Sequence, residues 1–119
     1  MKRTVIFYKT ADGKCPIQGF LDSLPAKAAR KVTWVLNLLE DLDVVPSTYF
    51  KKLGGTTGIY ECRVQFGSNA YRIFCFFDSG SVIVLTHGFQ KKSRKTPMSE
   101  IERAESFRRD LLGRRPKNE

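Results

Sequence analysis

The side chains in this sequence that could do chemistry are mainly lysines and arginines. The chain has a single histidine and contains neither an HExxH nor a GxSxG motif, so histidine-based nucleophilic sites have little support. The cationic residues lie within strand-like segments or directly beside them. They are Lys51, Lys52, Arg63, Arg72, Lys91, Lys92 and Lys95.

A cluster of these residues would act on a phosphodiester. When the 2′-hydroxyl of RNA attacks the adjacent phosphate, extra negative charge develops in the transition state, and fixed Arg and Lys groups stabilise it. A lysine whose pKa is lowered by neighbouring cations can accept the 2′-hydroxyl proton. Phe89 and His87 are candidates to stack on a base. A solvated surface that only binds phosphate uses the same residue types, and on those alone it is slightly favoured.

Three strand-like segments must position this cluster. Residues 59–66 alternate with period two, which places Cys62 on one face and the pair Glu61 and Arg63 on the other. Residues 71–77 and 82–87 are nearly continuous apolar runs that are separated by a short turn. We therefore expect an antiparallel meander, in which the end of one strand lies beside the start of the next.

The segments before the meander predict a strand over 3–8 and two helices. Pro16 suits the first position of a short helix. In the second helix Trp34 and Leu38 are expected to broaden the buried stripe. The glycine-rich residues 46–58 lack the pattern of a P-loop and are expected to form a flexible connection.

The segment after the meander predicts one more helix, over 97–112, with Thr96 as its N-cap and Pro97 at its first position. The resulting order is β-α-α-β-β-β-α. We predict one α+β domain over 1–112, with a small, mostly antiparallel sheet on which an N-terminal αα-hairpin and a C-terminal helix pack. Residues 113–119 are expected to form a basic, flexible tail.

The charge of the chain points to a polyanionic partner. The 119 residues carry a net charge of +9, of which +7 falls in residues 51–119. Cys15, Cys62 and Cys75 have no metal-ligand spacing and are read as reduced thiols. No apolar run approaches the roughly 20 residues of a membrane helix, and no signal peptide is evident. We therefore expect a cytoplasmic protein without a membrane partner.

Several motifs in a fixed order resemble those of one protein superfamily. They are IYECR at 59–63, YRIF at 71–74, HGFQKK at 87–92 and TPMSEI at 96–101. Together they make residues 4–112 similar to the RelE/ParE superfamily of toxin–antitoxin toxins, in particular its HigB-like, phage-related branch. The resemblance implies a RelE-like fold and a type II toxin that cleaves messenger RNA on the ribosome without a metal or other cofactor.

The resemblance also implies roles for individual residues. Arg63 matches the strand arginine that contacts the scissile phosphate, and Lys52 matches a candidate base or phosphate ligand. Lys91 and Lys92 match the position that protonates the leaving 5′-oxygen or contacts phosphate. Arg72 matches an arginine that is either structural or part of the site. Further substrate-binding candidates are Lys51, Lys95, Phe89 and His87.

The implied partners are the ribosome with its mRNA and a cognate antitoxin that carries a helix-turn-helix DNA-binding domain. Operator DNA would be contacted only through that antitoxin. The resemblance also leaves room for a ParE-like inhibitor that binds DNA gyrase without cleaving RNA, or for a non-catalytic nucleic-acid-binding regulator. The predicted last helix lacks the Tyr or His found in the site of RelE itself. Phe89 and His87 are the nearest aromatic substitutes, and a core contact explains each of them equally well.

Overall fold

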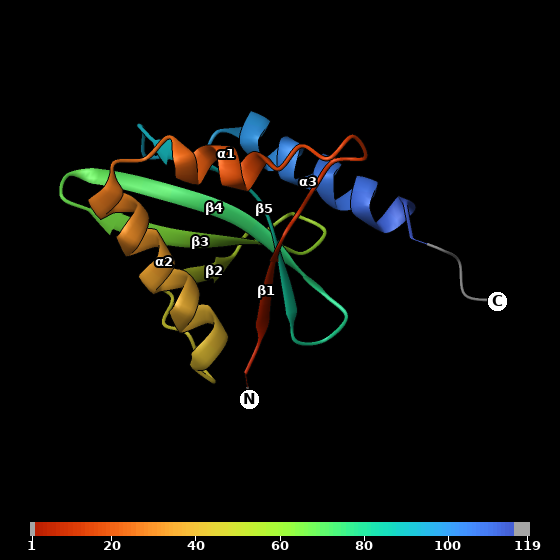
Figure 1. The fold of residues 1–119 in the computed structure, drawn as a ribbon, viewed down its shortest axis with the longest axis horizontal. Helices are drawn as coiled ribbons and strands as arrows, with labels where there is room; N and C mark the ends of the chain where they lie inside the picture. Colours follow the sequence, from red (N-terminus) through yellow and green to blue (C-terminus); the bar gives the residue numbers. More distant parts are fainter. Residues whose placement is uncertain (1, 116–119) are drawn as a thin grey trace.

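A five-stranded sheet, whose ribbon Figure 1 shows, carries Lys51, Lys52, Arg63, Arg72 and Lys91 on its strands. The structure is a computed structural model, and it describes residues 2–115. Its strand order is β1-β5-β4-β3-β2, with β1 parallel to β5 and every other pair antiparallel. The elements are β1 (Thr4–Phe7), α1 (Pro16–Asp22), α2 (Ala26–Asp41), β2 (Phe50–Lys52), β3 (Ile59–Phe66), β4 (Asn69–Asp78), β5 (Val82–Lys91) and α3 (Met98–Gly113).

Helices cover both faces of the sheet (Figure 1). α1 and α2 bury Ile17 and Val35 against one face, where Cys62 and Ile73 of the meander also lie. α3 buries Ala104 against the opposite face, together with Phe74 and Phe76 from β4 and their neighbours. This is the predicted α+β architecture, with an αα-hairpin and a C-terminal helix packed on a mostly antiparallel sheet.

A bulge in β5 changes which face its second half presents. Phe74 lies opposite His87, whereas the next residue, Cys75, lies opposite Leu85, so Thr86 is an extra residue in the ladder. Leu85 belongs to the core under α1 and α2, while Phe89 packs into the core under α3. The bulge therefore places His87 and Phe89 on the α3 face, where uninterrupted alternation would have placed them on the other.

Gly88 allows α1 to approach the sheet closely. A Cβ atom at this position would come within 2.4 Å of Cδ2 and 2.8 Å of Cγ of Phe20 in α1. The ring of Phe20 therefore occupies the space that any other residue at position 88 would fill. It also meets the ring of Tyr71 edge to face, at 6.1 Å between centroids.

Three local expectations from the sequence are wrong. The predicted flexible connection over 46–58 contains a further strand, β2, so the observed order is β-α-α-β-β-β-β-α. Trp34 does not join the buried stripe of α2, because 47% of it is exposed. Thr96 does not cap α3, whose N-cap is Pro97 without a side-chain hydrogen bond. The Thr96 hydroxyl donates to Glu61 instead.

Cys62 and Cys75 are buried and free, and burial raises the pKa of the Cys62 thiol to about 12. Of the predicted tail, Arg114 donates to the Lys9 carbonyl and Arg115 contacts Asp78, while residues 116–119 lie outside the described part.

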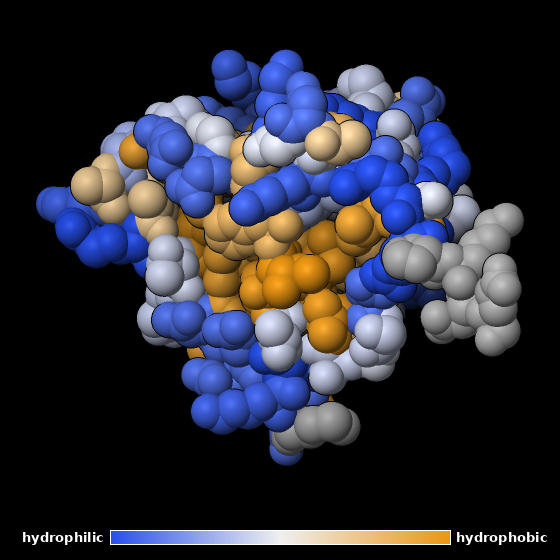
Figure 2. Space-filling view, turned by 45° about the vertical axis from the view of Figure 1, so that its right-hand side comes forward, coloured by the Kyte–Doolittle hydropathy of each residue, from blue (hydrophilic) through white to orange (hydrophobic). Residues whose placement is uncertain are grey.

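None of the three described helices is long and apolar enough to span a bilayer. Figure 2 shows hydrophobic side chains gathered in the middle of one face, within hydrophilic surroundings.

Candidate functional site

Glu61 is the centre of a polar cluster on the α3 face of β3. Its carboxylate belongs to a residue that is only 1% exposed. Oε1 accepts a hydrogen bond from Nε of Arg63 at 2.9 Å and lies 3.6 Å from Nε of Arg72. Oε2 accepts a hydrogen bond from the Thr96 hydroxyl at 3.1 Å. One buried carboxylate therefore holds two arginines and the start of α3 in fixed positions.

The sheet register places the two arginines side by side. Arg63 on β3 lies directly opposite Arg72 on β4, and Arg72 lies opposite Phe89 on β5. Two like charges on facing positions would repel each other without the carboxylate between them. Burial lowers the pKa of the Arg72 guanidinium, and the charge of Glu61 acts against this lowering. Glu61 thus makes a close arginine pair compatible with the folded sheet.

Both arginines keep hydrogen-bonding capacity for a ligand. The Arg63 side chain is 32% exposed and uses Nε for Glu61. Arg72 is more buried and donates from Nη1 to the Tyr71 carbonyl at 3.0 Å. Within residues 2–115, Nε of Arg72 is buried without a hydrogen-bond partner. A guanidinium has five N–H donors, so the pair can still donate several hydrogen bonds to an anion.

The lysines divide between the two faces of the sheet. Lys51 lies opposite Glu61 on the neighbouring strand and therefore shares the face of Arg63. Lys52 lies opposite Tyr60 and points to the other face, towards the α2 side. Lys91 lies opposite Ala70, one row beyond the arginine pair on the α3 face.

Lys92 and Lys95 follow β5 in an exposed segment that leads to α3. This segment is tethered to the arginine cluster at its end, where the Thr96 hydroxyl binds Glu61. The structure therefore brings together Lys51, Arg63, Arg72 and Lys91 on one face, keeps Lys92 and Lys95 near the edge, and separates Lys52.

His87 lies beneath this surface and does not reach it. It is 1% exposed, and its Nε2 lies 3.2 Å from Oε1 of Glu100 while Nδ1 lies 3.2 Å from the Thr86 hydroxyl. Burial, reinforced by the charge of Arg103, lowers the pKa of His87 to about 4, although Glu100 acts in the opposite direction. His87 is therefore neutral at neutral pH and is held as a core residue.

Phe89 connects this core to the arginine pair. Its ring packs edge to face on Phe74, with 5.4 Å between centroids, and it remains partly exposed. Its position opposite Arg72 places it on the sheet surface beside the guanidiniums. It is the one aromatic candidate from the sequence that has both a fixed position and an accessible surface.

A pocket of about 470 Å³ opens where the arginine pair meets the edge of β3. The backbone N–H of Arg63 donates to the Tyr49 carbonyl at 2.8 Å, which fixes the segment before β2 against this edge. Residues from α2, this segment, β3 and β4 line the pocket. They are Lys31, Thr48, Tyr49, Arg63, Val64, Gln65 and Arg72. The sequence placed Glu61 beside Arg63, and their ion pair is observed. It did not indicate the contacts of Glu61 with Arg72 and Thr96, or Lys31 and Tyr49 as pocket residues.

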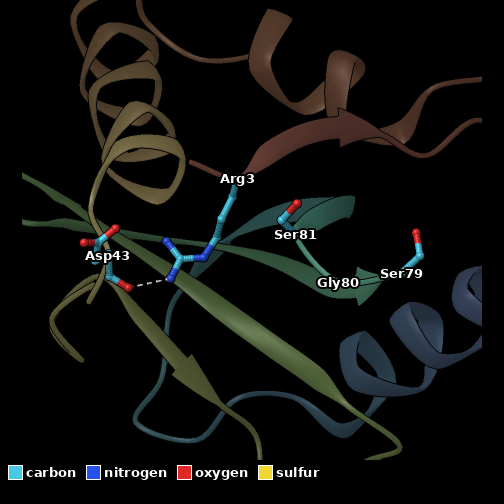
Figure 3. A pocket seen from close by; sticks show the side chains of 5 residues that line it. All are labelled: Arg3, Asp43, Ser79, Gly80 and Ser81. Carbon is cyan, nitrogen blue, oxygen red and sulfur yellow. Dashed lines mark hydrogen bonds between the residues drawn. The ribbon is translucent and has the colours of Figure 1, made fainter. Parts of the chain in front are cut away.

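A larger hollow of about 800 Å³ lies at the other end of the sheet (Figure 3). It is lined by Arg3, Asp43 and the turn from Ser79 to Ser81. The Arg3 guanidinium donates to the carbonyls of Leu39, Leu42 and Asp43, at the C-terminal end of α2. Arg3 thus satisfies the free carbonyls at the C-terminal end of α2.

The charges around the smaller pocket suit an anion. Two guanidiniums and one buried carboxylate leave a net positive charge, and Lys51 and Lys91 add to it on the same face. Such fixed donors can bind a phosphodiester and stabilise the additional charge that develops when it is attacked. Among residues 2–115 no group of three or more His, Cys, Asp or Glu side chains is arranged to hold a metal ion.

Comparison with known proteins places the chain in a family. The family model described as phage-derived protein Gp49-like (DUF891) matches residues 19–109, which is well over half of the chain. The chain belongs to this family. The matched region of the Gp49-like chain includes Glu61, both arginines and the basic segment after β5. No curated protein sequence matches.

A solved structure shows the same fold. It is a chain of the crystal structure of the archaeal RelE–RelB complex from Pyrococcus horikoshii OT3, with 21% sequence identity and a TM-score of 0.53. The match covers 80% of the Gp49-like chain and 100% of the archaeal one. The RelE-like fold that the sequence motifs predict is thus confirmed.

Proposed function

We propose that this Gp49-like protein is the toxin of a type II toxin–antitoxin system and acts as a metal-independent, ribosome-dependent mRNA endonuclease. The observation that carries the proposal is the arginine pair, Arg63 and Arg72, which shares one buried carboxylate and lines a surface pocket. The RelE-like fold and the family membership agree with it. A surface that only binds phosphate would not need its guanidiniums fixed so firmly.

The proposed reaction is an internal transesterification of RNA. The 2′-oxygen of one nucleotide forms a bond to the phosphorus on its own 3′ side, and the bond from phosphorus to the 5′-oxygen of the next nucleotide breaks. The products are a 2′,3′-cyclic phosphate and a 5′-hydroxyl end. One proton leaves the 2′-hydroxyl and one is gained by the departing 5′-oxygen. Arg63 and Arg72 neutralise the charge that builds up on the phosphate oxygens between these two events.

Lysines on the α3 face supply the remaining cationic groups. Lys51, opposite Glu61, stands beside the arginine pair and is assigned to the proton transfer or to the phosphate. Lys91, one row outward, and Lys92 are assigned to the leaving side of the scissile bond. Phe89 forms the floor on which a base adjacent to the scissile phosphate rests. Lys52 was a candidate base by resemblance, and its position on the other face makes Lys51 the better assignment.

The proposed partner is an antitoxin that covers this basic surface. The archaeal chain with the same fold is part of a RelE–RelB complex. For the present chain, we propose an antitoxin that presents acidic or apolar groups to the arginine pocket and carries a helix-turn-helix domain for operator DNA.

The decisive experiment is to map mRNA ends in a translating extract after addition of the purified protein. We expect new 5′-hydroxyl ends inside codons of translated messages, and far fewer when ribosomes are removed. Intact mRNA with ribosomes present would overturn the proposal. Intact mRNA together with gyrase-dependent DNA breaks would instead favour the ParE-like alternative.

The adjacent lysines of β2 provide a matched pair of variants. We expect Lys51→Ala to lower the cleavage rate at least about tenfold, because it removes a cation from the face of the arginine pair. Lys52→Ala makes the same change in charge on the same strand. Its cleavage rate should stay within about twofold of the wild type, because the Lys52 side chain lies on the other face. The measurement is the rate of mRNA cleavage at equal protein concentration. The reverse order would show that Lys52, rather than Lys51, serves the site.

A further inference from the structure

Trp34 is a large aromatic side chain that the fold leaves accessible on α2. It is 47% exposed, although the helical period of the sequence predicts it at the border of the buried stripe. Its indole is held in place by an edge contact with Tyr49, at 5.7 Å between centroids and an interplanar angle of 79°. Nζ of Lys31 lies over the ring, 5.0 Å from the centroid. A positioned, accessible ring beside a cation has the composition of a nucleobase platform.

The charge of α2 favours a polyanionic occupant for this platform. Lys27, Arg30 and Lys31 all lie within the two helical turns that precede Trp34, and α2 has no acidic residue before Glu40. A single-stranded nucleic acid matches both features at once, because its phosphates suit the cations and its bases suit the exposed ring.

The arginine pocket adjoins the platform. Lys31 lines the pocket that Arg63 and Arg72 also line, and it is the same lysine that lies over Trp34. Tyr49 likewise lines the pocket and contacts the indole. The two features share two residues, so a strand bound at the arginines and continuing past the edge of β3 would arrive at Trp34.

We propose that Trp34, together with Lys31 and Tyr49, forms a binding subsite for one nucleotide of single-stranded RNA, next to the nucleotide bound at the arginine pair. The base stacks on the indole, and Lys31 pairs with the adjoining phosphate. Because any base offers a flat face to an indole, this subsite adds affinity for the strand without selecting a codon. The inference rests on the proposed function for the identity of the ligand, but RNA binding at Trp34 requires no cleavage.

The platform contains its own spectroscopic probe, because Trp34 is the only tryptophan in the chain. The first experiment is a titration of Trp34 fluorescence with a 2′-O-methyl oligoribonucleotide, which cannot be cleaved by attack of its own 2′-oxygen. We expect saturable quenching by this oligonucleotide and little quenching by heparin, a polyanion without bases. Equal quenching by both ligands, or none by the oligonucleotide, would overturn the stacking proposal.

The second experiment measures the affinity of the same fluorescently labelled oligonucleotide by anisotropy. Trp34→Ala should weaken binding about tenfold, Trp34→Phe should recover most of it, and Lys31→Ala should weaken it less than Trp34→Ala does. Asn37→Ala, an exposed position later in α2, serves as the matched control and should bind as the wild type does. A Trp34→Ala protein with wild-type RNA affinity would overturn the proposal. If the same variant also lost binding to a co-expressed antitoxin, Trp34 would belong to a protein interface instead of an RNA subsite.

The two proposals fail separately in these assays. If the wild type binds the oligonucleotide through Trp34 but leaves translated mRNA intact, the endonuclease function is wrong and the subsite is supported. If the wild type cleaves mRNA while Trp34→Ala retains full affinity, the subsite is wrong and the endonuclease function stands.

Discussion

Arginine serves opposite purposes at the two ends of the sheet. At the hollow between α2 and the β4–β5 turn, the Arg3 guanidinium donates to three backbone carbonyls of its own chain. Figure 3 draws the one to Asp43. At the edge of β3, Arg63 and Arg72 share a single carboxylate and line an open pocket. The first hollow is the larger, at about 800 Å³ against about 470 Å³.

This difference favours the smaller pocket as the functional end in our proposal, because its arginines keep free donors although its volume is smaller. A guanidinium whose N–H groups already bind carbonyl oxygens contributes to stability and offers little to a ligand. A guanidinium fixed through one atom retains donors and charge for an incoming phosphate. The predictions below test this contrast, beginning with the largest effect.

The largest effect is expected from Arg63→Ala. Loss of one fixed donor to a developing oxyanion lowers rates by about 10²-fold to 10³-fold, so we expect mRNA cleavage to fall by that amount. Arg3→Ala, measured in the same assay at equal concentrations of folded protein, should cleave as the wild type does. Similar losses in both variants would show that the two ends of the sheet do not differ in function.

The next largest effect concerns His87, a buried neighbour of the arginine cluster. Its pKa is lowered from the ordinary 6.5 to about 4 in the folded protein. The unfolded chain therefore takes up the proton first as the pH falls. The contribution of His87 to stability is complete above about pH 6.5 and is lost towards pH 4, by about 3 kcal/mol.

Urea unfolding at pH 7 and at pH 4 measures this loss. His87→Gln cannot titrate, and so the wild type should lose about 3 kcal/mol more than the variant between the two pH values. Equal losses would mean that folding leaves the pKa of His87 unchanged, and burial would then not hold it neutral.

Arg3→Ala should lower the free energy of unfolding by about 2 kcal/mol, because charged hydrogen bonds to three carbonyls are lost at the end of α2. Urea unfolding at neutral pH measures this change. Lys2→Ala is the matched control, since its ion pair with Asp41, at 3.9 Å, is exposed and contributes little. An Arg3→Ala protein as stable as the control would show that Arg3 does not stabilise the end of α2.

The smallest effect is expected from Glu61→Gln. Glutamine keeps the shape of the side chain and removes the charge that holds Arg63 and Arg72. We expect the turnover number to fall about tenfold, because the guanidiniums are less firmly positioned. RNA affinity should not weaken, because the surface becomes more positive. Parallel loss of turnover and affinity, at equal concentrations of folded protein, would show that Glu61 does not act by positioning the guanidiniums.

Local sequence patterns predicted a large part of this molecule. The alternation in 59–66 correctly placed Arg63 and Glu61 on the face opposite Cys62, and the two apolar runs correctly predicted the rest of the meander. Pro16 correctly marked the start of α1. These predictions succeeded because period and backbone preference act over a few residues and do not depend on the rest of the chain.

The failures involve features set by distant contacts. β2 has three residues and carries no readable period, so its pairing with β3, which separates Lys51 from Lys52, was not foreseen. Thr96 has the sequence position of an N-cap. Its hydroxyl instead donates to the buried carboxylate of Glu61, 35 residues away. Trp34 fits the helical stripe, yet 47% of it remains exposed.

The sequence by itself determined the cationic character of the chain, the meander and the face on which Arg63 lies, because charge and strand alternation are local properties. Only the tertiary structure decided which cations lie together. The register of three strands sets Arg63 beside Arg72, a one-residue bulge turns Phe89 towards them, and one buried carboxylate holds the pair. The contact of α2 with the segment before β2 then places Trp34 beside the same pocket. These juxtapositions depend on hydrogen bonds and packing between residues far apart in the chain, which no local pattern records.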